Sequence, residues 1–220
     1  MKSLYKQSGF TLVEMIVSLA IFAIVVTVSV GALLVLVGTN QRLQGEQNVM
    51  TNLSFALDSM TREIRTGSHY YCFANLNSSQ ITTNGNSLDS ALTNQSTGAY
   101  LVSDCSQGNN SDLQYHGLAF IEGGDSISGT GNRIVYFYDT QQKTIYRRIG
   151  TGPAQSIISP DVHIIDFEFF VTGSDNLQTS GGAATRQPTV TLYIRAAENS
   201  DGSGKQFDLQ TTVTQRTLDV

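Results

Sequence analysis

The chain has 220 residues, enough for one folded domain together with a long extension. Charged residues make up only 14% of the sequence, and Ser, Thr, Asn, Gln and Gly take their place, a composition that suits an exported surface protein. The net charge is -5 and no run of Lys and Arg appears along the chain, which argues against a nucleic-acid-binding surface built on a basic patch.

An uncharged, apolar stretch occupies residues 15–38. As a helix it would extend about 36 Å, which is enough to cross a bilayer core of about 30 Å. The stretch is too long for the core of an ordinary secretory signal, and no small-residue cleavage site follows it. Lys2 and Lys6 precede it with no acidic residue, which favours a cytoplasmic N-terminus and places the rest of the chain outside the cytoplasm.

Glu14 stands just inside the apolar region. A carboxylate at mid-bilayer costs about 2.5–3.5 kcal/mol on insertion scales. Near the start of a helix it can stay close to the headgroups, where the helix N-terminus also favours negative charge. On these grounds alone, Glu14 is either an interfacial acid without a role or a functional group.

The stretch "GFTLVEMIVSLAIFAIV" resembles the class III signal of type IV prepilins and type II secretion pseudopilins. It has a basic leader, residues 1–9, that ends in Gly9, then Phe10, then Glu14 within an unbroken apolar run. The resemblance implies that a prepilin peptidase cleaves between Gly9 and Phe10 and that the new Phe10 amine is N-methylated. It also gives Glu14 a partner, the Phe10 ammonium of a neighbouring subunit or of the same chain, which would fix the register between subunits.

The same resemblance implies a location and a set of partners. The subunit would sit in membrane lipid of the bacterial cytoplasmic (inner) membrane and then move into a pilus or pseudopilus. Its partners would be other pilin or pseudopilin subunits and an inner-membrane assembly platform, and no cofactor is expected. Pili, type II secretion and DNA uptake all use such an N-terminus. The sequence therefore does not distinguish among these three machines, nor between a major and a minor subunit.

Residues 10–38 are expected to form the membrane-spanning or filament-core helix, and residues 39–66 its amphipathic continuation. The continuation has apolar residues in steps of three and four, which mark one helical face: Met50, Leu53, Leu57, Met60 and Ile64. Arg65 in the last turn and Gly67 beyond it predict the end of the helix. One helix from residue 10 to 65 would be about 84 Å long.

Residues 67–115 read as a polar, turn-rich insertion, either a partner-binding surface or a tolerated surface segment. Cys72 and Cys105 bracket it. An even pair of cysteines in a polar region predicts one disulfide in an oxidising compartment, with two unrelated free thiols as the alternative.

Residues 116–220 predict an antiparallel β-sheet domain, with strands at 116–121, 133–139, 143–149, 162–171, 188–196 and 205–218. Three of these strands alternate, with one face made by Ile165, Phe167, Phe169 and Val171, by Val190, Leu192 and Ile194, and by Phe207, Leu209 and Val213. The helix would lie across this sheet, which gives an α+β fold, the pilin fold. The stretches "ALDSMTREIR", "IIDFEFFV", "PTVTLYI" and "FDLQTTVTQR" resemble the J-type minor pseudopilins and related minor pilins.

Catalytic and metal-binding patterns are weak. The histidines, His69, His116 and His163, follow no ligand spacing, and no nucleophile elbow is present. The turn from Glu198 to Asp201 could bind calcium weakly, but it lacks the spacing of an EF-hand loop, and a plain surface turn is favoured. The sequence therefore predicts a structural subunit and not an enzyme. The alternative is a membrane-anchored extracellular binding or adhesion module, which would use residues 67–115 or a sheet edge.

Overall fold

In a computed structural model, the described residues are 9–74, 92, 101–105, 115–123, 133–150, 152–174, 187–198 and 204–216. The chain divides into two compact units, Met1–Gly45 and Glu46–Val220. The predicted leader, apart from Gly9, lies outside the described residues.

A single helix, α1 (Leu12–Thr66), contains 55 residues and contributes to both units. It begins and ends close to the predicted residues and is not interrupted at Gly31, Gly38 or Gly45. Gly67 directly follows its last residue. A Cβ at Gly67 would lie 2.4 Å from a ring carbon of Phe120, so glycine is needed there for close approach of the backbone to the sheet.

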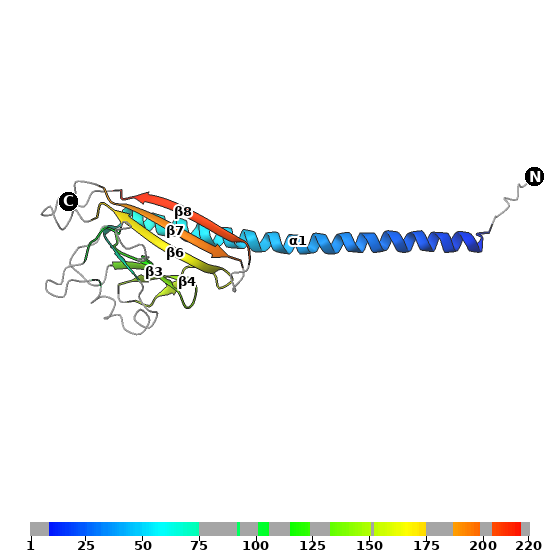
Figure 1. The fold of residues 1–220 in the computed structure, drawn as a ribbon, viewed down its shortest axis with the longest axis horizontal. Coiled ribbons are helices and arrows are strands. Elements are labelled where there is room, and N and C mark those ends of the chain that lie inside the picture. The colour runs from blue at the N-terminus through cyan, green and yellow to red at the C-terminus, as the bar shows by residue number, and fades with distance from the viewer. Residues whose placement is uncertain are drawn as a thin grey trace, which may run out of the picture. The chain divides into compact units, whose positions relative to one another are not determined.

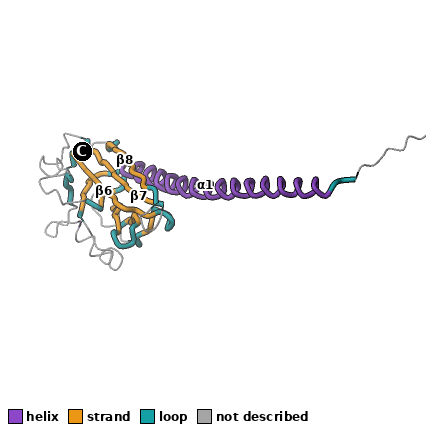
Figure 2. Tube along the Cα trace, turned by 45° about the vertical axis from the view of Figure 1, so that its right-hand side comes forward, coloured by secondary structure: helices purple, strands orange, loops and turns teal. Residues whose placement is uncertain are grey.

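The second unit contains two antiparallel sheets where the sequence predicted one. The first sheet has the order β1 (Ser68–Phe73), β2 (Gly117–Ile121), β3 (Arg133–Asp139), β4 (Thr144–Ile149) and β5 (Gln155–Ser156). The second has the order β6 (His163–Thr172), β7 (Thr189–Ala197) and β8 (Gln206–Thr214), which run side by side in Figures 1 and 2. A long helix packed on antiparallel sheets confirms the predicted α+β architecture.

Two short strands, β1 and β5, were not predicted from the sequence. β1, "SHYYCF", lies at the start of the segment 67–115 that reads as a polar insertion, and it pairs with β2. Leu92, from the middle of that segment, is also buried, at 1% exposure. Residues 67–115 therefore supply a strand and several core residues, among them Tyr70 and Leu92, to the fold. Most of their predicted partner-binding surface lies outside the described residues.

The second half of α1 packs through one apolar stripe, made of Val49, Leu53, Ala56, Leu57, Met60 and Ile64. The stripe joins one hydrophobic cluster with inward-facing residues of both sheets, including Phe120, Tyr136, Phe167 and Leu192. Met50, which the sequence placed on this face, is 39% exposed, and Val49 is buried instead. Successive residues of an α-helix are rotated by about 100° around its axis, so when Val49 lies on the buried stripe, the adjacent Met50 lies outside it.

The alternation predicted for β6 was wrong at one position. Ile164 is buried and Ile165 is only partly buried, whereas Phe167, Phe169 and Val171 are buried as predicted. The pairing of β6 with β7 shifts register between Ile164 and Asp166. A bulge of this kind adds one residue to a strand and reverses the face of every side chain before it.

The predicted disulfide between Cys72 and Cys105 is present, with the two Cα atoms 6.0 Å apart. Cys72 belongs to β1 in the first sheet. Cys105 forms an antiparallel bridge with Val171 of β6 in the second sheet. The disulfide therefore links the two sheets covalently through a short segment of chain.

Candidate processing and assembly segment

Thr11 and Glu14 form the start of α1. The backbone N–H of Glu14 donates to the Thr11 hydroxyl at 3.3 Å, and the Thr11 N–H donates to the Glu14 carboxylate at 3.4 Å. This reciprocal pattern is a capping box, in which a Thr and a Glu three residues later satisfy two N–H groups that the helix leaves without partners. Glu14 thus has a local structural role in addition to any role in assembly.

The apolar half of α1 has almost no cover within its own unit. Its large hydrophobic side chains between Leu12 and Val37 are 40% to 75% exposed. Apolar side chains exposed around the whole circumference of a helix require another apolar environment, either lipid or neighbouring helices. The helix is long and apolar enough to cross a membrane, which is consistent with membrane anchoring.

The polar side chains in this half of α1 find their partners inside the helix. Four hydroxyls, those of Ser18, Thr27, Ser29 and Thr39, each donate to the backbone carbonyl four residues earlier, at 2.7 to 2.9 Å. A hydroxyl bonded in this way does not need water. These residues are therefore compatible with an environment free of water.

Gly9 and Phe10 precede the helix and carry no regular secondary structure. Phe10 is 74% exposed, and apart from the chain neighbours of Gly9, no atom of the described residues lies within 4 Å of the position that a Cβ would take there. The bond between them is therefore open to approach from outside. The Phe10 nitrogen belongs to a peptide bond while the leader is attached, so Glu14 contacts Thr11 and not an ammonium group in this form of the chain.

Within the second unit, Glu63 fixes α1 to the first sheet. Its carboxylate accepts hydrogen bonds from Arg147 Nε at 2.9 Å and Nη2 at 2.8 Å, and from the Tyr136 hydroxyl at 2.6 Å. Burial, followed by the hydrogen bond and the negative charge of Glu63, raises the pKa of Tyr136 well above its usual value. Burial alone would lower the pKa of Arg147, but the hydrogen bonds and charge of Glu63 outweigh it and raise that pKa.

The three histidines are not brought together. His116 is buried, and its Nδ1 lies 2.7 Å from the carbonyl oxygen of Phe167, whereas His69 Nδ1 lies 3.0 Å from the Ser68 hydroxyl. Among the described residues, no three His, Cys, Asp or Glu side chains gather where they could hold a metal ion. The weak calcium site considered at Glu198 and Asp201 is only half described, since Asp201 lies outside the described residues.

Sequence reasoning proposed Gly9, Phe10 and Glu14 as site residues and missed two other features of the structure. The capping box was readable from "TLVE", because a Thr followed by a Glu three residues later is its local signature. The ion pair between Glu63 and Arg147 could not be predicted from the sequence, because 84 positions separate the two residues.

Comparison with known proteins bears on this N-terminal segment. Residues 4–30 match the family described as the prokaryotic N-terminal methylation motif, and the matched residues include Gly9 and Phe10, the capping box and much of the apolar run. No curated protein and no solved structure matches the chain. The likeness to J-type pseudopilins thus stays a prediction. The motif indicates a type IV pilin-like prepilin signal, which suggests a structural subunit and implies processing by a prepilin peptidase and assembly with other pilins.

Proposed function

We propose that this chain is a minor pilin or pseudopilin that polymerises through the apolar half of α1 into a pilus or pseudopilus. The observation that carries the proposal is the continuity of the methylation motif with an apolar helix that has no cover in its own unit. Before assembly, lipid of the bacterial inner membrane covers this helix, with the N-terminus in the cytoplasm and the second unit outside. After assembly, the helices of neighbouring subunits cover it.

Processing is proposed to occur between Gly9 and Phe10, followed by N-methylation of Phe10. The exposure of Phe10 and the open space around Gly9 support access by a peptidase. Cleavage would leave Thr11, and so the capping box, intact. The new ammonium group would lie one residue from the Thr11 N–H that the Glu14 carboxylate already contacts.

The new ammonium group would give Glu14 a partner of opposite charge. In a water-free bundle of helices an unpaired carboxylate is costly, so the pair would favour one axial register between subunits. The partner would be the Phe10 ammonium of a neighbouring subunit in the filament, after pairing within one chain in the membrane. An inner-membrane assembly platform would extract the subunit.

The processing step is tested by mass spectrometry of the protein purified from a peptidase-competent strain and from a peptidase-deficient one. We expect the competent strain to give a chain that begins at Phe10 and carries one added methyl group. The deficient strain should retain the nine-residue leader. A mature N-terminus at any other residue would overturn the proposal.

The role of Glu14 is tested with two variants that separate charge from capping. Glu14→Gln keeps an acceptor for the Thr11 N–H but removes the charge, whereas Thr11→Ala removes the capping hydroxyl and keeps the charge. We expect both to insert into the membrane, and we expect Glu14→Gln alone to reduce recovery in filaments, by about tenfold or more. Equal recovery of the two variants would count against the charge pair.

A further inference from the structure

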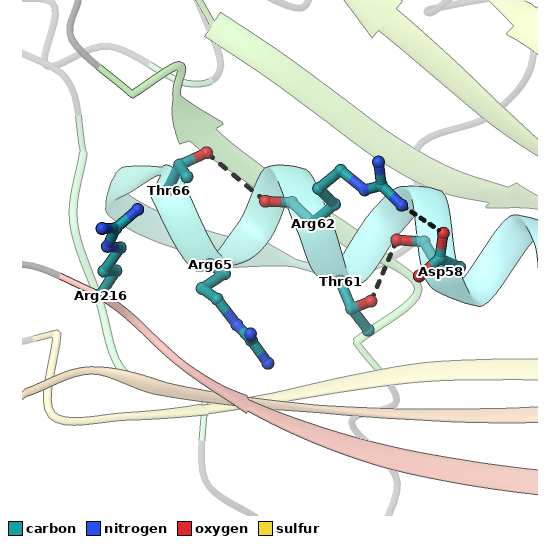
Figure 3. A pocket seen from close by; sticks show the side chains of 6 residues that line it. All are labelled: Asp58, Thr61, Arg62, Arg65, Thr66 and Arg216. Atoms are coloured by element: carbon teal, nitrogen blue, oxygen red, sulfur yellow. Dashed lines mark hydrogen bonds and ion pairs between the residues drawn. The ribbon is translucent and has the colours of Figure 1, made fainter.

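A hollow of ≈ 380 Å³ lies beside the last turns of α1, and Figure 3 shows the side chains that line it: Asp58, Thr61, Arg62, Arg65, Thr66 and Arg216. Arg216 follows β8 and is far from the others in the sequence. A hydrogen bond of 2.8 Å from its backbone N–H to the Arg65 carbonyl brings it to the end of the helix. The fold thus gathers three arginines that are not clustered along the chain.

The hollow has an excess of positive charge. Its described lining residues include three arginines and one acidic residue, Asp58, whose carboxylate is bonded to Arg62 at 2.8 Å. Arg65 and Arg216 are exposed and form no ion pair with any residue in the described part of the chain. Other basic side chains of the second unit are paired within the fold: Arg147 with Glu63, Arg195 with Asp208, and Lys205 with Glu46.

Arginines near a helix C-terminus often serve to satisfy its last carbonyl groups. Here those carbonyls already have other donors. The Glu63 carbonyl accepts from the Gly67 N–H at 3.0 Å and from the Thr66 hydroxyl at 3.1 Å. The carbonyl of Ile64 accepts from the Tyr70 hydroxyl, and that of Arg65 accepts from a backbone N–H.

Within the described part of the chain, the guanidinium groups of Arg65 and Arg216 are therefore not used by an ion pair. In Figure 3 the Arg65 side chain extends away from the helix axis, and the side chain of Arg216 lies at the end of the helix beside Thr66. Neither is drawn with an interaction to another lining residue, whereas the side chain of Arg62 is turned toward Asp58.

We propose that this hollow binds a phosphate-class dianion. A guanidinium group presents parallel N–H donors that match two oxygens of a phosphate. Among the described lining residues, three positive charges and one negative charge leave an excess that a dianion neutralises and a monoanion does not. The volume lies within the range of about 300–1,000 Å³ that small-ligand sites occupy. The proposal does not depend on filament assembly.

The test is a calorimetric titration of the full chain, in a detergent with an uncharged sugar headgroup, with inorganic phosphate at constant ionic strength. We expect saturable binding to one site. Arg65→Gln and Arg216→Gln should each weaken it by about tenfold, the usual effect of losing a charge-assisted contact. Arg195→Gln removes the same charge elsewhere on the second unit and should leave the affinity unchanged.

Asp58→Asn provides a test of opposite sign. It removes the carboxylate that competes for Arg62, so it should tighten phosphate binding several-fold. Comparison of Asp58→Asn with the wild-type chain still tests the phosphate site if an arginine variant fails to fold. Unchanged or weaker binding by Asp58→Asn would overturn the proposal, as would equal weakening by Arg195→Gln or the lack of saturable binding to the wild-type chain.

Two further ligands distinguish the possible sources of the phosphate. Glycerol 3-phosphate, a monoester with a dianionic terminal group, should bind about as well as inorganic phosphate. Dimethyl phosphate, a diester with a single charge like those of a polymer backbone or a lipid headgroup, should bind more weakly. Binding of the diester as tight as that of the monoester would overturn the assignment of a dianion site.

Discussion

Arg147 and Glu63 form a two-point ion pair, with Nε donating at 2.9 Å and Nη2 at 2.8 Å. The residues are 84 positions apart, one on β4 and the other on α1. The Tyr136 hydroxyl of β3 donates to the same carboxylate. Whereas apolar contacts allow a helix to slide over a sheet, these directional bonds fix the end of α1 at one position on the first sheet.

Glu63→Gln should destabilise the fold by about 2–3 kcal/mol, because it removes the charge that Arg147 and Tyr136 both face at a half-buried site. The measurement is the free energy of unfolding in denaturant. Asp58→Asn is the matched control, since its ion pair with Arg62 is an exposed pair within one helix, with side chains 68% and 78% exposed. That pair should be worth less than about 0.5 kcal/mol. Equal losses in the two variants would show that Glu63 does not anchor the helix.

The stability of the fold should fall in alkaline solution. Burial, with help from the charges of Asp166 and Asp139, raises the pKa of Tyr138 to about 12, and burial with Glu63 raises the pKa of Tyr136 further. Below about pH 10, a tyrosine is protonated in both the folded and the unfolded chain, so this contribution to stability is complete. Above that pH the unfolded chain loses the proton first, so stability decreases as the pH rises through about 12.

The alkaline effect is measured as the free energy of unfolding between pH 9 and pH 12, a range that starts below the unfolded tyrosine pKa and reaches the folded pKa of Tyr138. The double variant Tyr136→Phe, Tyr138→Phe should show a smaller slope over this range. An unchanged slope would mean that other groups cause the loss.

The bulge in β6 predicts unequal costs for two neighbouring isoleucines. Ile164→Ala should cost about 2–4 kcal/mol, because Ile164 has 0% exposure and its removal leaves a cavity. Ile165→Ala should cost less than about 1 kcal/mol, because that side chain is only partly buried. Denaturant unfolding of the two variants checks the order, and the reverse order would indicate a strand without the bulge.

Replacing both Cys72 and Cys105 by serine should cost about 3–4 kcal/mol, given the 33-residue separation that the disulfide closes. The loss should be largest where the two sheets meet. Val171 N–H donates to the Cys105 carbonyl at 3.3 Å, so its hydrogen exchange should accelerate in the variant. Ile194, which lies deep in the pairing of β6 with β7, serves as the reference amide. Equal acceleration at both amides would show that the disulfide stabilises the domain without linking the sheets locally.

The sequence predicted most of the fold because most of its signals are periodic and local. The helix from Leu12 to Thr66 has a long apolar run followed by one amphipathic stripe, and the strands of the second sheet alternate clearly. The predictions that were wrong lie where a single residue interrupts the regular spacing of buried positions along a helix or strand. The bulge at Ile165 and the choice of Val49 over Met50 depend on packing between segments, which no short window of sequence contains.

The residues proposed to be functional differ in the same way in how far the sequence could predict them. Gly9, Phe10 and Glu14 lie within a few positions of one another and were predicted together. The arginine-lined hollow was not predicted, because Arg216 reaches Arg65 only after β8 has paired with β7. The charge analysis of the sequence correctly found no basic run, yet the fold creates a local excess of positive charge.

The internal hydrogen bonds of Ser18, Thr27, Ser29 and Thr39 have a consequence for transfer between environments. A segment whose hydroxyls are bonded to its own backbone keeps the same polar partners on leaving one apolar medium for another. No hydrogen bond of these side chains must be broken or replaced on the way. Among the side chains of this apolar segment, only that of Glu14 is ionisable, so under the proposed function the electrostatic difference between lipid and filament would rest on this carboxylate and on the Phe10 ammonium that cleavage creates.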